Sequence, residues 1–100
     1  MSKHEYRSNQ EKNAQKAKRN RALVELAKAG GCVDCGLDEP DILEFDHVPE
    51  RGEKLRDIGP MVASGAGVAV LLAELAKCDV VCPNCHRRRT NVRRQFGRTC

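Results

Sequence analysis

Three residues of this chain have side chains suited to hydrolytic chemistry. Asp46 and His47 are adjacent within the stretch "LEFDHV", and His86 directly follows Cys85. A carboxylate oxygen and an imidazole nitrogen can hold a divalent cation that keeps open positions for water and a phosphate oxygen. A second imidazole, with an ordinary pKa near about 6.5, can take a proton from an attacking water. We therefore interpret Asp46 and His86 as candidate metal ligands and His47 as a candidate general base.

Each histidine also has a purely structural interpretation. His47 could be a half-buried histidine of a strand, and His86 could be a zinc-type residue that no metal uses. Taken singly, each residue fits that interpretation better. Taken together, and flanked by basic ends, the three residues favour a functional site.

Four of the six cysteines form two C-x-x-C pairs, Cys32 with Cys35 and Cys82 with Cys85. Such a turn presents both sulfurs to one tetrahedral ion, and two thiols this close along the chain are poorly placed for a relaxed disulfide. Four thiolates leave no open position for a substrate, so the spacing predicts structural zinc that clamps the two ends of the intervening segment. Outside the pairs, we expect Cys78 to be a small buried residue and Cys100 a free thiol, neither of them a nucleophile.

Composition supports a metal-stabilised domain. A chain of 100 residues with 3% aromatic residues and no Trp buries only a modest core, so a further source of stability is expected. The first residues are polar and charged rather than an apolar signal, which predicts an intracellular, cytoplasmic protein with reduced thiols. The apolar run over residues 61–76 is short, rich in Gly and Ala, and contains Glu74, so we predict no membrane association.

Charge is distributed unevenly along the chain. Residues 1–28 contain eight Lys and Arg against three acids, residues 86–100 contain six Arg and no acid, and residues 29–85 contain four basic residues against eleven acids. Two basic ends around an acidic middle would allow a polyanion such as nucleic acid to be held by the ends. Two solvated charged tails are the alternative explanation.

Local patterns predict the elements that must position these residues. We expect a helix over residues 1–29 ended by Gly30 and Gly31, a strand near residues 42–46, and a helix over residues 68–77 after a short helical piece that breaks at "SGAG". A second short strand lies in "CDVVC", and a helix follows over residues 83–95. For Asp46 and His47 to serve one site, the first strand must end or bulge there, and Pro49 is consistent with such an end.

The segments "LEFDHV" and "LAKCDVVCPNCHRRRT", with the four cysteines around them, resemble the HNH endonucleases, in particular small four-cysteine members from phage and bacterial genomes. The resemblance covers residues 31–91. It implies a small zinc-stabilised α+β domain with the ββα-metal (HNH, His-Me finger) fold and extra helices. The implied divisions are a basic N-terminal helix or arm (1–30), the nuclease domain (31–95) and a C-terminal tail (96–100).

The resemblance also implies roles for individual residues. Asp46 and His86 would hold a catalytic Mg²⁺, Mn²⁺ or Ni²⁺ ion, and His47 would be the general base, while Cys32, Cys35, Cys82 and Cys85 would bind structural zinc. The family's middle asparagine, which orients the base, is replaced at the expected position by Lys77. An ammonium group donates but cannot accept hydrogen bonds, so another group must orient His47 or activity is weak or lost. Candidates for phosphate contacts are Lys77, Arg87 and Arg88.

The resulting hypothesis is a metal-dependent HNH endonuclease that hydrolyses phosphodiester bonds of DNA in a bacterial or phage-infected cell. Binding mainly through phosphates implies weak sequence preference and strong salt sensitivity. A packaging terminase of a phage is an implied partner. The alternative is a catalytically idle zinc module that binds DNA or a protein, and a zinc-ribbon subunit of an RNA-binding assembly is a third hypothesis that leaves Asp46, His47 and His86 unexplained.

Overall fold

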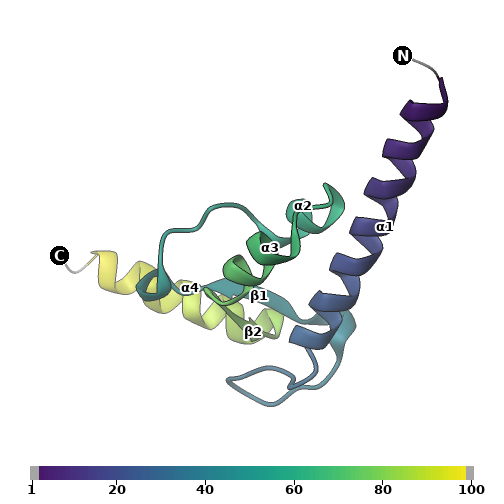
Figure 1. The fold of residues 1–100 in the computed structure, drawn as a ribbon. Coiled ribbons are helices and arrows are strands. Elements are labelled where there is room, and N and C mark those ends of the chain that lie inside the picture. The colour runs from purple at the N-terminus through teal and green to yellow at the C-terminus, as the bar shows by residue number, and fades with distance from the viewer. Residues whose placement is uncertain (1–2, 99–100) are drawn as a thin grey trace.

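Two short antiparallel strands lie between the helices of this protein (Figure 1). The computed structural model describes the backbone of residues 3–98 and the side chains of residues 11–95. Strand β1 (Glu44–His47) pairs with β2 (Cys78–Val81) in a register that sets Asp46 opposite Asp79 and His47 opposite Cys78. Helix α4 (Pro83–Arg98) starts two residues after β2 and packs against β1. The predicted small α+β arrangement, with a two-stranded sheet beside a helix that starts at Pro83, is therefore confirmed.

The boundaries differ from the predicted ones by a few residues. A 3₁₀ turn, η1 (Pro40–Ile42), occupies the start of the stretch predicted as a strand, because proline at its first position favours a turn over a ladder. Strand β1 consequently begins at Glu44 and ends at His47, and a second 3₁₀ turn, η2 (Pro49–Arg51), follows it. Helix α4 extends to Arg98 rather than residue 95. Cys100 lies outside the described residues.

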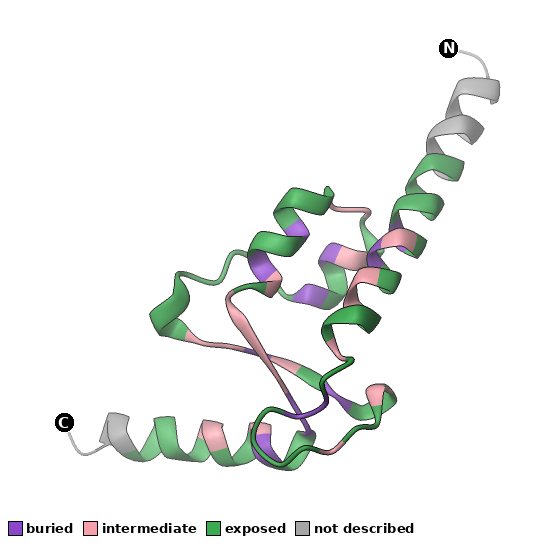
Figure 2. Ribbon diagram, turned by 60° about the horizontal axis from the view of Figure 1, so that its bottom comes forward, coloured by how far each residue is buried: buried purple, intermediate pink, exposed green. Residues whose placement is uncertain are grey.

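Helix α1 (Lys3–Ala27) packs its C-terminal half on α2 (Ile58–Ala63) and α3 (Val68–Leu75). Asn20 is fully buried there, and its Nδ2 donates to the Ala66 carbonyl at 3.0 Å. Leu26, by contrast, is 72% exposed. Residues 11–16 of α1 are exposed (Figure 2).

The apolar side chains form two small clusters rather than one core. The first surrounds the cysteine pairs and contains Cys32, Leu43, Val81, Cys82 and Cys85, with Leu37 and Val80 packed against it. The second joins α1, α2 and α3 around Ile58, Met61 and Leu71. Within residues 3–98, no helix combines the length and apolar character needed to cross a membrane.

Two glycines shape the first cysteine pair. Gly31 and Gly36 both have left-handed backbone angles, with φ of 75° and 81°. A Cβ atom at Gly31 would stand 2.9 Å from the Leu37 carbonyl oxygen, so no larger residue fits without a shift. The turn closes with a hydrogen bond of 2.9 Å from Cys32 N to the Leu37 carbonyl.

Candidate metal centre and active-site cleft

The four paired cysteines meet at one point, although the two pairs are far apart in the sequence. Ligand atoms of Cys32, Cys35, Cys82 and Cys85 all lie within 4.8 Å of one another. The sulfurs of Cys35 and Cys82 are 3.7 Å apart, and two thiolates of a tetrahedral zinc site with Zn–S bonds of about 2.3 Å would be about 3.8 Å apart. The residues present therefore fit zinc, and the four cysteines are positioned to bind a metal ion, as the spacing predicted.

The electrostatics of this cluster also call for a cation. Burial and the neighbouring cysteines raise the pKa of Cys85 to about 12, whereas at Cys32 backbone hydrogen bonds outweigh burial and lower the pKa to about 6. Several thiolates in so small a space repel one another unless a positive ion lies between them.

Cys78 stands apart from the cluster: its thiol donates to the Glu74 carbonyl at 3.4 Å, and burial raises its pKa to about 11. It is half-buried, and such a thiol is a poor nucleophile.

A separate cleft of about 390 Å³ contains the three residues predicted to do chemistry. Asp46, His47 and His86 all line it, together with Phe45, Lys54, Asp57, Ile58 and Gly59. Side chains of consecutive strand residues normally face opposite sides of a sheet. Here β1 ends at His47 and turns at Pro49, and both Asp46 and His47 border the same cleft.

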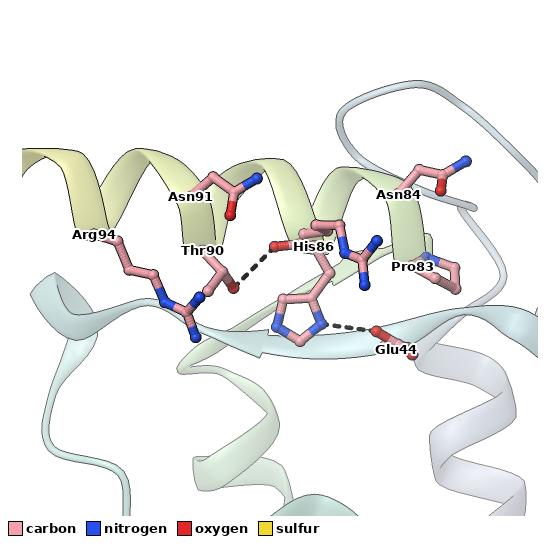
Figure 3. A pocket seen from close by; sticks show the side chains of 8 residues that line it. Glu44, Pro83, Asn84, His86, Thr90, Asn91 and Arg94 are labelled. Atoms are coloured by element: carbon pink, nitrogen blue, oxygen red, sulfur yellow. Dashed lines mark hydrogen bonds and ion pairs between the residues drawn. The ribbon is translucent and has the colours of Figure 1, made fainter.

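His86 is held between two carboxylates. Its Nδ1 donates to Glu44 Oε1 at 2.8 Å, and its Nε2 lies 3.5 Å from Asp46 Oδ1 (Figure 3 shows the contact with Glu44). Both ring nitrogens of His86 therefore face a carboxylate oxygen. Two adjacent ligands of an octahedral ion at about 2.1 Å lie roughly 3 Å apart, so these two atoms, 3.5 Å apart, would have to approach one another to hold a divalent cation. Glu44 would then fix the imidazole from behind, as carboxylates do for ligating histidines.

Asp46 is buried and receives two arginines from α4. Arg93 donates to Oδ1 at 2.7 Å and to Oδ2 at 2.8 Å, and Arg89 donates to Oδ2 at 2.8 Å. Burial alone would raise the pKa of Asp46, but these hydrogen bonds outweigh it and hold the pKa at about 2. A carboxylate oxygen has two lone pairs, so Oδ1 keeps one toward His86.

Among the described residues, the four cysteines are the only group of three or more metal-ligating side chains placed for one ion.

Arg89 joins three acids that would otherwise repel one another. Its guanidinium contacts Asp34 at 2.7 Å, Asp46 at 2.8 Å and Asp79 at 2.9 Å, and the last two are directly opposed across the strands. Like charges opposite one another in a sheet are destabilising. The side chain of Arg89 is 22% exposed and that of Asp46 is 2% exposed, so this pairing is only weakly screened by solvent.

Replacing Arg89 with methionine is expected to lower the free energy of unfolding by about 1–3 kcal/mol, because the buried Asp46 keeps only one of its two arginines. The matched control is Arg88→Met on the same helix, where the arginine has no ion pair among the described residues and the change should fall within about 0.5 kcal/mol. Chemical denaturation of the zinc-loaded protein, followed by circular dichroism, measures both. Equal stability of the two variants would contradict the bridging role of Arg89.

His47 contacts a residue that the sequence did not single out. Its Nε2 is 2.9 Å from Oε2 of Glu74, a buried residue of α3. Glu74 also accepts hydrogen bonds from Lys77 Nζ at 2.9 Å and from the Leu55 amide at 3.0 Å. Burial would raise the pKa of Glu74, but these three donors outweigh it and hold the pKa at about 2. The sequence carries one signal that could have indicated this contact. Glu74 is a lone acid in an otherwise apolar helix, and it lies three residues before Lys77.

The three residues predicted to contact phosphates lie in different surroundings. Lys77 is engaged within the protein, since its ammonium also donates to the Glu53 carbonyl at 2.8 Å. Arg87 lines a groove of about 550 Å³ along α4, together with His86, Thr90, Asn91 and Arg94 (Figure 3). Arg88 lines a third cleft that also includes Cys35 and Cys85. Only Arg87 thus shares a groove with one of the predicted catalytic residues.

Comparison of the chain with models of protein families, with curated proteins and with solved structures finds no significant match. A proposal about its function therefore depends on the chemistry of the site itself.

Proposed function

We propose that this protein is a metal-dependent DNA endonuclease of the HNH type, built on a zinc-stabilised ββα-metal fold. One observation carries the proposal: Asp46, His47 and His86, the three residues whose types suit hydrolytic chemistry, line a single cleft. Each of the three side chains is held by charged partners. The buried carboxylate of Glu74 contacts His47, the exposed carboxylate of Glu44 contacts His86, and two arginines fix Asp46.

The proposed mechanism assigns each side chain a separate task. Asp46 and His86 would hold a divalent cation, which when bound offsets negative charge on the scissile phosphate and on the departing oxygen. His47 would take the proton of the attacking water through the ring nitrogen that Glu74 does not occupy. Lys54 also lines the cleft, and its ammonium, now paired with Asp57, would be the nearest positive charge for a neighbouring phosphate. The four cysteines would hold zinc in a purely structural role, away from this cleft.

DNA would lie against α4. His86 lines both the cleft and the longer groove, so the groove is a direct continuation of the proposed site. Arg87 and Arg94 line the groove, and in Figure 3 the Arg94 side chain points to the same side of the helix as His86. Arginines spaced along a groove bind successive phosphates and give little base discrimination.

A catalytically idle zinc module that binds DNA is the second candidate. One observation favours it: both carboxylate oxygens of Asp46 already accept hydrogen bonds from Arg89 and Arg93. A divalent cation must therefore share Oδ1 with Arg93. The two candidates use the same groove and differ in whether a phosphodiester bond breaks.

The test is incubation of zinc-loaded protein with supercoiled plasmid and Mg²⁺, Mn²⁺ or Ni²⁺, with Asp46→Asn as a comparison. Relaxed plasmid that appears with the wild type and at least one metal, and not with Asp46→Asn, supports the nuclease. A gel shift of the plasmid without nicking by any metal would establish the idle module and overturn the nuclease.

Changing Arg87 and Arg94 together to glutamine is expected to weaken DNA binding and its salt dependence. Each lost phosphate contact reduces the slope of log affinity against log salt by about 0.9, so the double variant should lose about 1.8. Fluorescence anisotropy of a labelled duplex at several salt concentrations measures the slope. The matched control is Lys12→Gln with Lys18→Gln on α1, which leaves the α4 groove intact and should change the slope less. The reverse order of effects would place the DNA on α1.

A further inference from the structure

The replacement of the expected asparagine by Lys77 leaves open what orients His47. We propose that Glu74 is the positioning residue for His47, and that Lys77 serves as the cation that holds Glu74 in place. This inference rests on the proposed nuclease function and adds to it a residue that the family pattern does not supply. It is carried by contacts among three elements: β1, α3 and the loop over residues 52–57.

Glu74 has the geometry of a fixed acceptor. Its side chain is 1% exposed, and each of its oxygens is engaged: Oε2 by His47 and the Leu55 amide, Oε1 by Lys77. A carboxylate of this kind can only accept, so the His47 nitrogen at 2.9 Å must be the protonated one. The Nε2 proton therefore stays on the ring, and in the neutral form of the ring Nδ1 is the nitrogen with the lone pair that a general base needs. Among residues 11–95, no group hydrogen-bonds to Nδ1 of His47.

Lys77 makes three contacts that hold this arrangement in place. Its ammonium pairs with Glu74 Oε1 at 2.9 Å and donates to the Glu53 carbonyl at 2.8 Å, while its own carbonyl accepts from the Val48 amide at 2.8 Å. Lys77 thereby ties the end of β1 to the loop that carries Lys54 and Asp57, two other residues of the cleft. An amide at position 77 could orient a base by itself, whereas a lysine achieves this only through an acid such as Glu74.

The first test reads the imidazole directly. In zinc-loaded protein labelled with ¹⁵N, NMR should show His47 protonated at Nε2, with that proton protected from exchange with water. In Glu74→Ala the Nε2 proton should exchange too fast to be observed, and in Glu74→Gln, whose amide oxygen can still accept, it should remain visible. A wild-type His47 protonated at Nδ1, or an Nε2 proton unchanged in Glu74→Ala, would overturn the proposal. This readout judges Glu74 even if the protein cuts no DNA, in which case only the proposed function fails.

The second test uses plasmid nicking. Glu74→Ala is expected to lower kcat by about 10- to 100-fold with little change in KM, as losses of supporting partners commonly do, and Glu74→Gln should retain part of the rate. Glu53→Ala is the matched control, because it removes an exposed acid and keeps the backbone carbonyl that Lys77 uses. Lys77→Asn should also slow the reaction, since Glu74 loses its cation. Faster nicking by Lys77→Asn than by the wild type would show that the amide, not Glu74, is the effective partner.

Discussion

Replacing His47 with alanine is expected to abolish plasmid nicking, with a loss of about 10²- to 10⁴-fold in rate. The physical reason is the absence of another proton acceptor in the right place. His86 is held by Glu44 and faces Asp46, and Asp46 is held by two arginines and keeps a pKa of about 2, so neither can take the proton of an attacking water near neutral pH. Initial rates with the wild type and the variant at saturating metal measure the loss.

Binding of DNA should survive this substitution. His47 lies outside the α4 groove, and its side chain is 16% exposed, so alanine removes little contact surface. Anisotropy titrations should give dissociation constants for the variant and the wild type within about threefold of each other, a difference of roughly 0.7 kcal/mol. A variant that loses binding and nicking together would indicate a structural role for His47.

Two controls separate chemistry from contamination and misfolding. His4→Ala, purified in the same way, changes another of the three histidines and should nick at the wild-type rate. Added imidazole should partly restore nicking by His47→Ala, because a small base can occupy the space left by the missing ring. Nicking by His47→Ala at the wild-type rate would exclude His47 as the base.

The parts of the fold that the sequence predicted are those set by nearby residues. The turns of the two cysteine pairs and the start of α4 at Pro83 each depend on a few consecutive positions. The meeting of the two cysteine pairs was also predictable, since four thiols in this spacing have one common chemical use. The start of β1 was missed because the turn that begins at Pro40 extends to Ile42, an apolar residue that suggested a strand.

The sequence did not predict the carboxylate partners of His47 and His86, because these contacts join elements that are far apart in the chain. Glu74 is 27 residues from His47, and Glu44 is 42 residues from His86, so no local pattern connects them. In the sequence, Glu74 is a single charge in an apolar run. In the fold it is buried beside Lys77, and that position makes it part of the candidate site. Such pairs depend on how α3 and α4 dock on the sheet, and that docking is a property of the folded chain.

The roles of the arginines in α4 also depend on how this helix docks on the sheet. The sequence presents a run of like residues, which suggested one DNA-binding surface. In the structure, Arg89 and Arg93 are four residues apart and turn inward to Asp46, while Arg87 and Arg94 line the outer groove. Which face of the helix meets the sheet decides between a structural and a binding role. Equal charge along a helix therefore does not imply equal function.

Removing zinc, or replacing Cys82 with serine, is expected to unfold the protein. Structural zinc contributes apparent free energies of about 10–16 kcal/mol in small domains, as much as the whole stability of many proteins. Cys32, Cys82 and Cys85 also form most of one apolar cluster, so losing the ion would open that cluster to water. Circular dichroism during titration with a strong chelator should show loss of helical signal, with about one zinc released per chain by colorimetric assay.

Cys78→Ser is the matched control for the cysteine substitution. Cys78 lies in β2, four residues before Cys82, but outside the cluster, so its variant should keep zinc and remain folded. A Cys82→Ser variant with wild-type helical signal and cooperative unfolding would show that the cluster does not stabilise the fold.

The same experiment separates the two proposed metal sites. The Cys82–His86 segment joins them, since Cys82 and Cys85 belong to the zinc cluster and His86 to the cleft, with the His86 amide donating to the Cys82 carbonyl at 2.9 Å. Loss of zinc should therefore abolish nicking even in excess Mg²⁺, because His86 loses its position. Removal of Mg²⁺ alone should stop nicking and leave the helical signal unchanged. Zinc-free protein that still nicked DNA at the wild-type rate would show that the cleft does not depend on the cysteines to hold its shape.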